Sequence, residues 1–251
     1  MKISVITVCL DSEMTIENTI KSVVNQDYND IEFIIIDGKS KDRTLNILEK
    51  YKHKITRIIS EKDHGIYHAI NKGLNLASGE IISLLHGNDI FAHSKVLSKV
   101  RIFFEKNKNI DVMLADLAFK NNFQSLNYKR YYKSTNFRPW MLRIGYSPPH
   151  LSSFFTKKGI KKNGLYDYNY KIAGDFEYFV RSFLVNNLIF KTYSECLIIM
   201  STGGLSGRNF KSYLISSIEI NKALKKNGFY SNILITFFRF PLKIIQFFIK
   251  K

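Results

Sequence analysis

Two short apolar runs, each leading to an acidic residue, constrain the fold of this chain more than any other feature. Residues 31–36 are mostly apolar and lead to Asp37, and residues 81–85 lead to Asn88 and Asp89. Apolar runs of this length are typical of strands that are buried on both faces of a parallel sheet. Ligands of such sheets bind beyond the carboxyl ends of the strands, so the two corners mark a candidate site for a nucleotide and a metal.

Strand and helix patterns alternate along the N-terminal part of the chain. Further strands are predicted at 3–9 and 55–60, and helices at about 15–24, 44–50, 65–77 and 95–107. Beyond an unclear region at 111–143, the patterns predict a strand at 152–156, a helix at 175–186 and a strand at 188–193. Alternating elements with short connections predict an α/β fold with a mostly parallel central sheet and helices on both faces.

The bulk composition indicates a folded, intracellular protein. The 251 residues are 45% hydrophobic, enough for one large packed domain with a smaller appendage. Of the two cysteines, Cys9 lies within the first strand pattern, so a buried thiol is expected there rather than a disulfide. The N-terminal apolar run is short and lacks a small-residue cleavage site, so it is predicted to be a core strand and not a signal peptide. These features favour a reducing compartment.

The charge is strongly positive and concentrated at the C-terminus. The formal net charge is +17, which suits nucleic acid, phosphorylated ligands or an anionic membrane, although part of it can reflect a general compositional bias. Residues 208–251 contain nine Lys or Arg and one acid, Glu219, among many apolar residues. We predict a domain at 1–207 followed by amphipathic helices at 208–251 that lie on an anionic membrane surface. The alternative is a terminal helix docked on the domain.

Polar residues at the ends of the first three strands could bind a nucleotide. Thr7 and Asp11 could contact a base or ribose, or cap the next helix. Asp37 could accept a hydrogen bond from a pyrimidine imide or a ribose hydroxyl, or be an ordinary turn residue. Asp63 lies in the loop after the third strand, and Lys72 on the next helix could meet a phosphate or point to solvent.

Two further acids are candidates for metal binding and proton transfer. Asp89 follows a buried strand, and one carboxylate with two phosphate oxygens suits a hard divalent cation, the alternative being a simple turn. Asp175 and Glu177 begin a predicted helix, where a carboxylate could accept a proton from an attacking hydroxyl or could cap the helix. The glycine-rich segment 201–208 ends in Arg208 and could close over a diphosphate.

Over about residues 2–206 the chain resembles inverting family 2 glycosyltransferases with the GT-A fold. The resemblance rests on ordered motifs: Ile6-Thr-Val-Cys-Leu-Asp11, Ile36-Asp-Gly-Lys-Ser-Lys-Asp-Arg-Thr44, Ser60-Glu-Lys-Asp-His-Gly-Ile-Tyr67, Asn71-Lys-Gly73, Gly79-Glu80, Asn88-Asp89, His150, Gly174-Asp-Phe-Glu177 and Gly203-Gly-Leu-Ser206. The third motif is similar to the branch that builds bacterial exopolysaccharide, capsule or O-antigen repeat units.

The resemblance implies an enzyme that uses a nucleotide-sugar and a divalent metal, Mn²⁺ or Mg²⁺. The implied nucleotide-sugar-binding residues are Thr7, Asp11, Asp37, Asp63, Asn71 and Asn88. Asp89 would bind the metal, and Asp175 would be the general base that deprotonates the acceptor hydroxyl for in-line attack with inversion. His150, Glu177 and Arg208 are candidates to position the acceptor or the diphosphate.

Two positions depart from the family pattern. The metal corner usually carries two adjacent acids, whereas the run here is His86-Gly-Asn-Asp89, so one negative charge is missing and metal affinity could be weaker. The first turn ends Leu10-Asp11, where the family often has an aromatic residue followed by Asn.

The expected function is sugar transfer from a nucleoside-diphosphate-sugar, expected to be a UDP-sugar, to a lipid-linked oligosaccharide in bacterial surface polysaccharide biosynthesis. The enzyme is expected to be cytoplasmic and peripheral at the inner face of the cell membrane. One alternative is a nucleotidyltransferase, which normally has a glycine-rich basic loop that this chain lacks. Another is a catalytically impaired nucleotide-sugar or polyanion-binding protein. The sequence has no recognised nucleic-acid motif, so nucleic acid is not an expected partner.

Overall fold

The computed structural model describes residues 1–121, 123, 125, 127–201 and 210–239 of the chain. Among these residues, nine strands form one sheet with the order β3-β2-β1-β4-β8-β6-β9-β5, and β7 pairs with β6. The strands are β1 (Ile3–Cys9), β2 (Ile31–Asp37), β3 (Arg57–Ser60), β4 (Ile81–His86), β5 (Asp89–Phe91), β6 (Val112–Lys120), β7 (Arg130–Tyr132), β8 (Ser153–Thr156) and β9 (Phe190–Ser201).

The helices connect and flank these strands. They are α1 (Ile16–Val24), α2 (Thr44–Lys50), α3 (Ile66–Leu76), α4 (Val96–Lys106), α5 (Lys157–Asn163), α6 (Gly174–Val180), α7 (Phe210–Lys226) and α8 (Ile233–Phe237). Short 3₁₀ turns are η1 (Lys52–Lys54), η2 (Ser134–Asn136) and η3 (Pro139–Ile144), and a π-helical turn, η4 (Arg181–Val185), continues α6.

Strands β3, β2, β1 and β4 form the parallel half of the sheet. All of β1 and nearly all of β2 and β4 are buried, which explains their unbroken apolar patterns. Helix α3 packs so closely on β1 that a Cβ at Gly73 would lie 2.3 Å from Cγ2 of Ile6. This half confirms the α/β prediction, with elements within a few residues of the expected bounds.

The other half of the sheet is mixed. Strand β8 is antiparallel to both β4 and β6, whereas β6 and β9 are parallel. The register of β9 against β6 shifts between Tyr193 and Cys196, and β9 then continues to pair antiparallel with β5. This pairing places Met200 opposite Asp89 at the edge of the sheet where the candidate metal corner lies.

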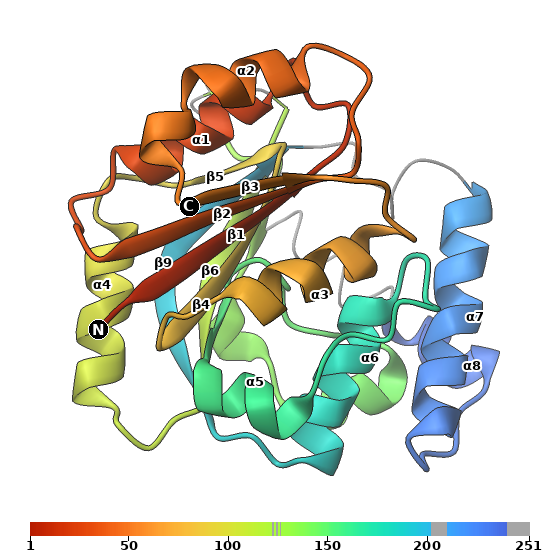
Figure 1. Ribbon diagram of the computed structural model, residues 1–251. Helices are drawn as coiled ribbons and strands as arrows, with labels where there is room; N and C mark the ends of the chain where they lie inside the picture. The colour runs from red at the N-terminus through yellow and green to blue at the C-terminus, as the bar shows by residue number, and fades with distance from the viewer. Residues whose placement is uncertain (122, 124, 126, 202–209, 240–251) are drawn as a thin grey trace.

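Helices cover both faces of the sheet (Figure 1). Helices α1, α2 and α4 lie on one face, and α3, α5 and α6 lie on the other. Helices α7 and α8 stand together beside α6, and α8 also contacts η3, so the described part of the predicted extension docks on the main domain. Within the described ranges, no helix has both the length and the apolar character that crossing a membrane requires.

Candidate functional site

The carboxyl ends of β1 and β2 are joined by a network around Asp37. This side chain is completely buried, and its Oδ2 accepts hydrogen bonds from the Ser40 amide at 3.0 Å and the Ser60 hydroxyl at 2.6 Å. Its Oδ1 accepts from the Ser40 hydroxyl and lies 3.7 Å from the Cys9 thiol. Cys9 is a free buried thiol, as expected, and burial raises its pKa. Asp37 therefore holds the strand ends together, and its contact with a nucleotide stays a prediction.

Asp11 and Thr7 occupy different environments although both belong to the first strand region. Asp11 is exposed, and its Oδ1 accepts a hydrogen bond from the Lys41 amide at 2.8 Å, which clasps the loops after β1 and β2 together. Thr7 is completely buried within β1, and its hydroxyl has no hydrogen-bond partner among the described residues. Of the two side chains, Asp11 alone lies where a ligand could reach it without rearrangement of the sheet.

Asp63 extends this corner from the loop after β3. A Cβ at Gly38 would lie 3.4 Å from its Oδ2, so the loops after β2 and β3 meet there. Its Oδ1 lies 2.6 Å from Nζ of Lys72, which is also paired with Glu61 at 2.8 Å. Lys72 is thus held between two acids, and a phosphate would have to displace them to bind it.

Asp89 is completely buried at the start of β5. Its Oδ1 accepts a hydrogen bond from the Ser201 amide at 3.1 Å, whereas its Oδ2 has no hydrogen-bond partner within the described part of the chain. Burial raises the pKa of Asp89 to about 8. Asn88 donates to the Ser201 hydroxyl at 2.9 Å and so supports the same corner.

A divalent cation fits the unpartnered oxygen of Asp89. Hard cations bind oxygen ligands, and the cation would supply a positive charge that offsets the negative charge of this buried carboxylate. Nδ1 of His86 lies 3.7 Å from this oxygen. In the described ranges, no group of three or more His, Cys, Asp and Glu side chains could hold a metal ion. A substrate diphosphate and water could supply further oxygen ligands to a metal held by Asp89.

His150 lies beside this corner and is coupled to an aromatic stack. Its ring centroid is 6.3 Å from that of His86, and its Nε2 lies 2.8 Å from the hydroxyl of Tyr166. Burial lowers the pKa of His150 to about 4 and that of His86 to about 3, so both rings are neutral at pH 7. Tyr166 in turn stacks on Tyr178 at 3.9 Å between ring centroids.

Asp175 lies in the first turn of α6, and Tyr67 of α3 positions the segment that carries it. The Tyr67 hydroxyl donates to the carbonyl of Ile172 at 2.7 Å and lies 3.5 Å from Oδ1 of Asp175. The Tyr67 ring also stacks with Tyr166, 5.9 Å away between centroids. One line of two buried tyrosines and two partly buried histidines therefore connects the surroundings of Asp175 to those of Asp89.

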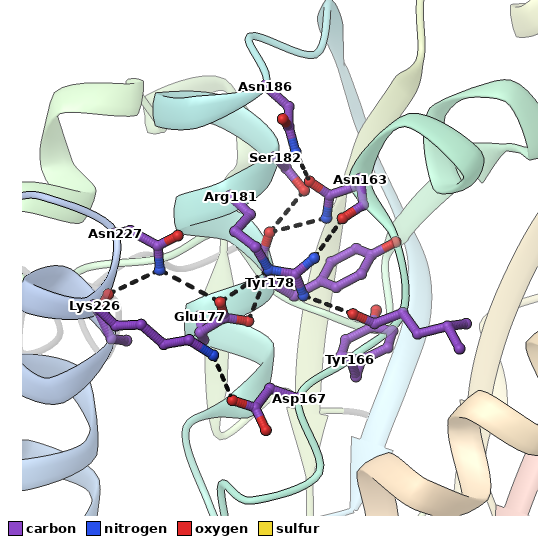
Figure 2. Close-up of polar contacts among 12 residues, drawn as sticks. Asn163, Tyr166, Asp167, Glu177, Tyr178, Arg181, Ser182, Asn186, Lys226 and Asn227 are labelled. Carbon is purple, nitrogen blue, oxygen red and sulfur yellow. Dashed lines mark hydrogen bonds and ion pairs between the residues drawn. The ribbon is translucent and has the colours of Figure 1, made fainter.

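The structure gives Glu177 and Asn71 contacts within the fold. Glu177 is completely buried and forms an ion pair with Nε of Arg181 at 2.9 Å (Figure 2). The side-chain Nδ2 of Asn71 donates to the backbone carbonyl of Tyr166 at 2.8 Å, and its Oδ1 accepts from the backbone amide of Tyr166 at 2.9 Å. Binding of ligand by Glu177 or Asn71 stays a prediction. Arg208 and the segment 203–206 lie outside the described residues.

Four residues with contacts near the candidate acids were given no role from the sequence: Tyr67, His86, Tyr166 and Glu219. Tyr67 belongs to a quoted motif, so its position beside Asp175 had a signal that could have been used. Tyr166 and Glu219 act through contacts that only the folded chain creates. A groove of about 670 Å³, lined by Glu80, Phe104 and neighbouring residues, contains none of the candidate residues and has no part in the site.

The fold is that of GT-A glycosyltransferases. Staphylococcus aureus TarS residues 1–349, solved with UDP-GlcNAc, align at a TM-score of 0.71 and 20% identity over 92% of this chain and 68% of that chain. A mannosyltransferase from Pyrobaculum calidifontis, solved with GDP-Man and Mn²⁺, aligns at 0.64 and 15% identity over 90% of this chain and 63% of that one. At these identities the likeness concerns the fold alone.

The family model described as Glycosyl transferase family 2 matches residues 4–166, and the chain belongs to this family. A glycosyltransferase of Methanocaldococcus jannaschii is 27% identical over 75% of this chain and 66% of its own length. The cholesterol galactosyltransferase of Borreliella burgdorferi is 34% identical over 51% of this chain and 36% of its own length. The chain thus spans about two thirds or less of these relatives.

Proposed function

We propose that the protein is an inverting glycosyltransferase that moves a sugar from a nucleoside-diphosphate-sugar, a UDP-sugar, to a lipid-linked saccharide. The observation that carries this proposal is the line of contacts from Asp89 through His86, His150, Tyr166 and Tyr67 to Asp175. It connects a buried carboxylate suited to a cation with a half-buried carboxylate suited to proton transfer. A transfer site needs both functions within reach of one substrate.

In the proposed reaction, an acceptor hydroxyl attacks the anomeric carbon of the donor. The new carbon–oxygen bond forms as the bond from that carbon to the diphosphate oxygen breaks, and the hydroxyl proton passes to Asp175. The nucleoside diphosphate leaves with the bonding electrons, and the anomeric configuration inverts. A divalent metal, when bound with Asp89, supplies positive charge that stabilises the leaving diphosphate. The corner proposed for the nucleoside is formed by the segments that carry Asp11, Asp37 and Asp63. The buried Asp37 would have to exchange a hydrogen bond within the fold for one to the nucleoside.

Known structures of the same fold support a nucleotide-sugar and a metal. TarS has been solved with UDP and with UDP-GlcNAc, and the Pyrobaculum mannosyltransferase with Mn²⁺. The name of the Borreliella relative includes a lipid acceptor, which supports a lipid-linked acceptor for this chain. The role in building a bacterial surface polysaccharide is part of the same proposal.

Exposed apolar residues at the C-terminal side support association with a membrane surface. Leu214 and Ile218 of α7 are 50% and 53% exposed, and Leu234 of α8 is 77% exposed. Trp140 of η3, which contacts α8, is also exposed. Lys211 and Lys225 are exposed on α7, so apolar and cationic groups occur together, as in helices that bind the interface of anionic membranes. We propose that the enzyme binds the cytoplasmic face of the cell membrane in this way.

The decisive experiment is a screen of nucleotide-sugars with the purified protein, Mn²⁺ or Mg²⁺ and anionic lipid vesicles. Slow metal-dependent release of a nucleoside diphosphate from one donor would support the proposal and identify that donor. If no donor reacts, calorimetric titration with UDP and Mn²⁺ follows. Absence of both reaction and binding would overturn the proposal in favour of a binding protein without transferase activity.

A further inference from the structure

Glu219 of α7 binds the segment that directly precedes Asp175. Its Oε1 accepts a hydrogen bond from the amide of Lys171 at 2.8 Å, and its Oε2 accepts from the amides of Ile172 at 2.9 Å and Ala173 at 2.7 Å. Three successive backbone N–H groups thus converge on one carboxylate. Hydrogen bonds to an ionised acceptor are stronger than neutral ones, so this contact fixes the path of the backbone at residues 171–173.

The same segment is held on its other side by α3. The carbonyl of Ile172 accepts the hydrogen bond from Tyr67, and the Tyr67 ring packs against Gly174. Asp175 follows directly, and its Oδ1 lies 3.5 Å from the Tyr67 hydroxyl. The backbone that leads to Asp175 is therefore clamped between α3 from the N-terminal half of the chain and α7 from the C-terminal extension.

Helix α7 is itself fixed to α6 and to the loop before it. Nζ of Lys226 lies 2.7 Å from Oδ2 of Asp167, and the Asn227 side chain donates to Oε1 of Glu177 at 3.3 Å. Figure 2 shows both contacts. Glu177 also pairs with Arg181, so the end of α7 is tied to the body of α6. Helix α7 is therefore held at two places: at its C-terminal end by the contacts of Lys226 and Asn227, and at Glu219 by the backbone of residues 171–173. The contact of Glu219 is the one that reaches the residues directly before Asp175.

We propose that Glu219 is a positioning residue for Asp175, and that the C-terminal extension is thereby a working part of the transfer site. This inference rests on the proposed function, in which Asp175 accepts the proton. Proton transfer requires the carboxylate within hydrogen-bond reach of the acceptor hydroxyl, and small displacements lower the rate strongly. The hydrogen bonds of Glu219 in the described part of the chain go to Lys171, Ile172 and Ala173 and not to the nucleotide corner. Glu219 should therefore affect turnover and leave donor binding unchanged.

The test compares Glu219→Gln with Glu105→Gln, which makes the same substitution at an exposed glutamate of α4 that pairs only with Arg101 among the described residues. The introduced glutamine keeps the size of the side chain and removes the charge that holds three N–H groups. We expect Glu219→Gln to speed hydrogen–deuterium exchange in the segment 168–178, to lower kcat for nucleoside diphosphate release by about tenfold to a hundredfold, and to leave the Kd for UDP with Mn²⁺ within about threefold. Glu105→Gln should match the unmodified protein in all three measurements.

Three results separate the possible failures. Unchanged exchange and unchanged kcat in Glu219→Gln would overturn the inference. Faster exchange across the whole chain together with lost UDP binding would make Glu219 a residue of general stability, and would overturn it as well. An Asp175→Asn variant measured in parallel tests the proposed function itself, because retained turnover there would refute Asp175 as the base whatever Glu219 does.

Discussion

The ring of Tyr67 lies so close to Gly174 that a Cβ at position 174 would be 2.6 Å from its Cε2. This contact joins a helix of the N-terminal half to the start of α6, although Asp175 is 108 residues from Tyr67 along the chain. Only a glycine permits the approach, and the approach brings the Tyr67 hydroxyl to Ile172 and Asp175. The glycine before the candidate base is thus required by packing.

Gly174→Ala should therefore destabilise the protein. The added methyl group meets three ring carbons of Tyr67 at 2.6–2.8 Å, and overpacking of this kind costs about 1–3 kcal/mol of unfolding free energy. Urea denaturation measures the loss. Tyr67→Ala should destabilise the Gly174→Ala variant by less than it destabilises the unmodified protein, because in the variant it also removes the clash with the added methyl group. Simple additivity of the two changes would contradict the packing explanation.

Asp175→Asn should abolish transfer and preserve donor binding. Loss of a general base lowers the rate by about 10²–10⁴-fold, while the amide keeps the shape of the side chain. Turnover is measured as nucleoside diphosphate release, and binding by calorimetry with UDP and Mn²⁺. Asp30→Asn, which removes an exposed acid near the N-terminus, is the matched control and should be unaffected. Joint loss of binding and turnover in Asp175→Asn would assign the residue a structural or donor-binding role.

Asn71→Ala should weaken the fold more than it weakens donor binding. Both hydrogen bonds of the Asn71 side chain go to the backbone of Tyr166, and their loss costs about 1–3 kcal/mol. Thermal unfolding would report the destabilisation, and calorimetry would report the affinity for UDP at a temperature where the variant is folded. A large loss of affinity in a variant of normal stability would instead support the donor-binding role predicted from the sequence.

The stability of the metal-free protein should decrease between pH 6.5 and pH 8 because of Asp89. Its pKa is about 8 in the native state against 3.8 ordinarily, so the native protein retains a proton that the unfolded chain has already lost. The stabilisation is complete below pH ~4 and disappears as the pH rises to about 8, with a slope of roughly 1.4 kcal/mol per pH unit. Urea denaturation in the presence of a chelator gives the free energy of unfolding at each pH. The difference between the unmodified protein and Asp89→Asn should show this slope, and the same pH dependence in both proteins would refute the prediction.

Replacing exposed apolar residues of α7 and α8 should weaken membrane binding. Each large aliphatic side chain contributes about 1.5–3 kcal/mol when it leaves water, so Ile218→Ser with Leu234→Ser should lower the affinity for anionic vesicles at least tenfold. Co-sedimentation with vesicles gives the affinity. Ile102→Ser on α4, where the isoleucine is also exposed, is the control and should bind normally. Equal vesicle binding by the double variant, the Ile102→Ser control and the unmodified protein would exclude this surface as the membrane contact.

The parallel half of the fold could be predicted from the sequence because its strands carry simple patterns. Strand β6 was missed in the unclear region, since Asp116 interrupts its apolar residues. That carboxylate is completely buried and accepts hydrogen bonds from the Ser134 amide, the Ser134 hydroxyl and the Tyr131 hydroxyl. The hydrogen-bond donors of this buried acid lie 15–18 positions later in the chain, so no neighbouring residue in the sequence indicates that Asp116 belongs to a buried strand.

The candidate site divides in the same way. Asp37 at the end of β2 and Asp89, which follows β4, were visible because each comes after an apolar run. The strand predicted at 188–193 is β9, which continues to Ser201 because its second part pairs with both β6 and β5. Glu195 within it pairs with Lys99. The contact of Glu219 with the segment before Asp175 depends on how α7 docks, and no spacing in the sequence encodes that docking.

The contacts of Glu219 reach back 46–48 residues along the chain, and this has a consequence for synthesis in the cell. The strands and helices of the nucleotide corner emerge from the ribosome first and can fold first. The segment before Asp175 has to wait for α7 before its backbone amides find their acceptor. Under the proposed function, a nascent chain would therefore acquire its proposed nucleotide corner before the backbone that positions the proposed base, and a partly made enzyme would not consume activated sugars.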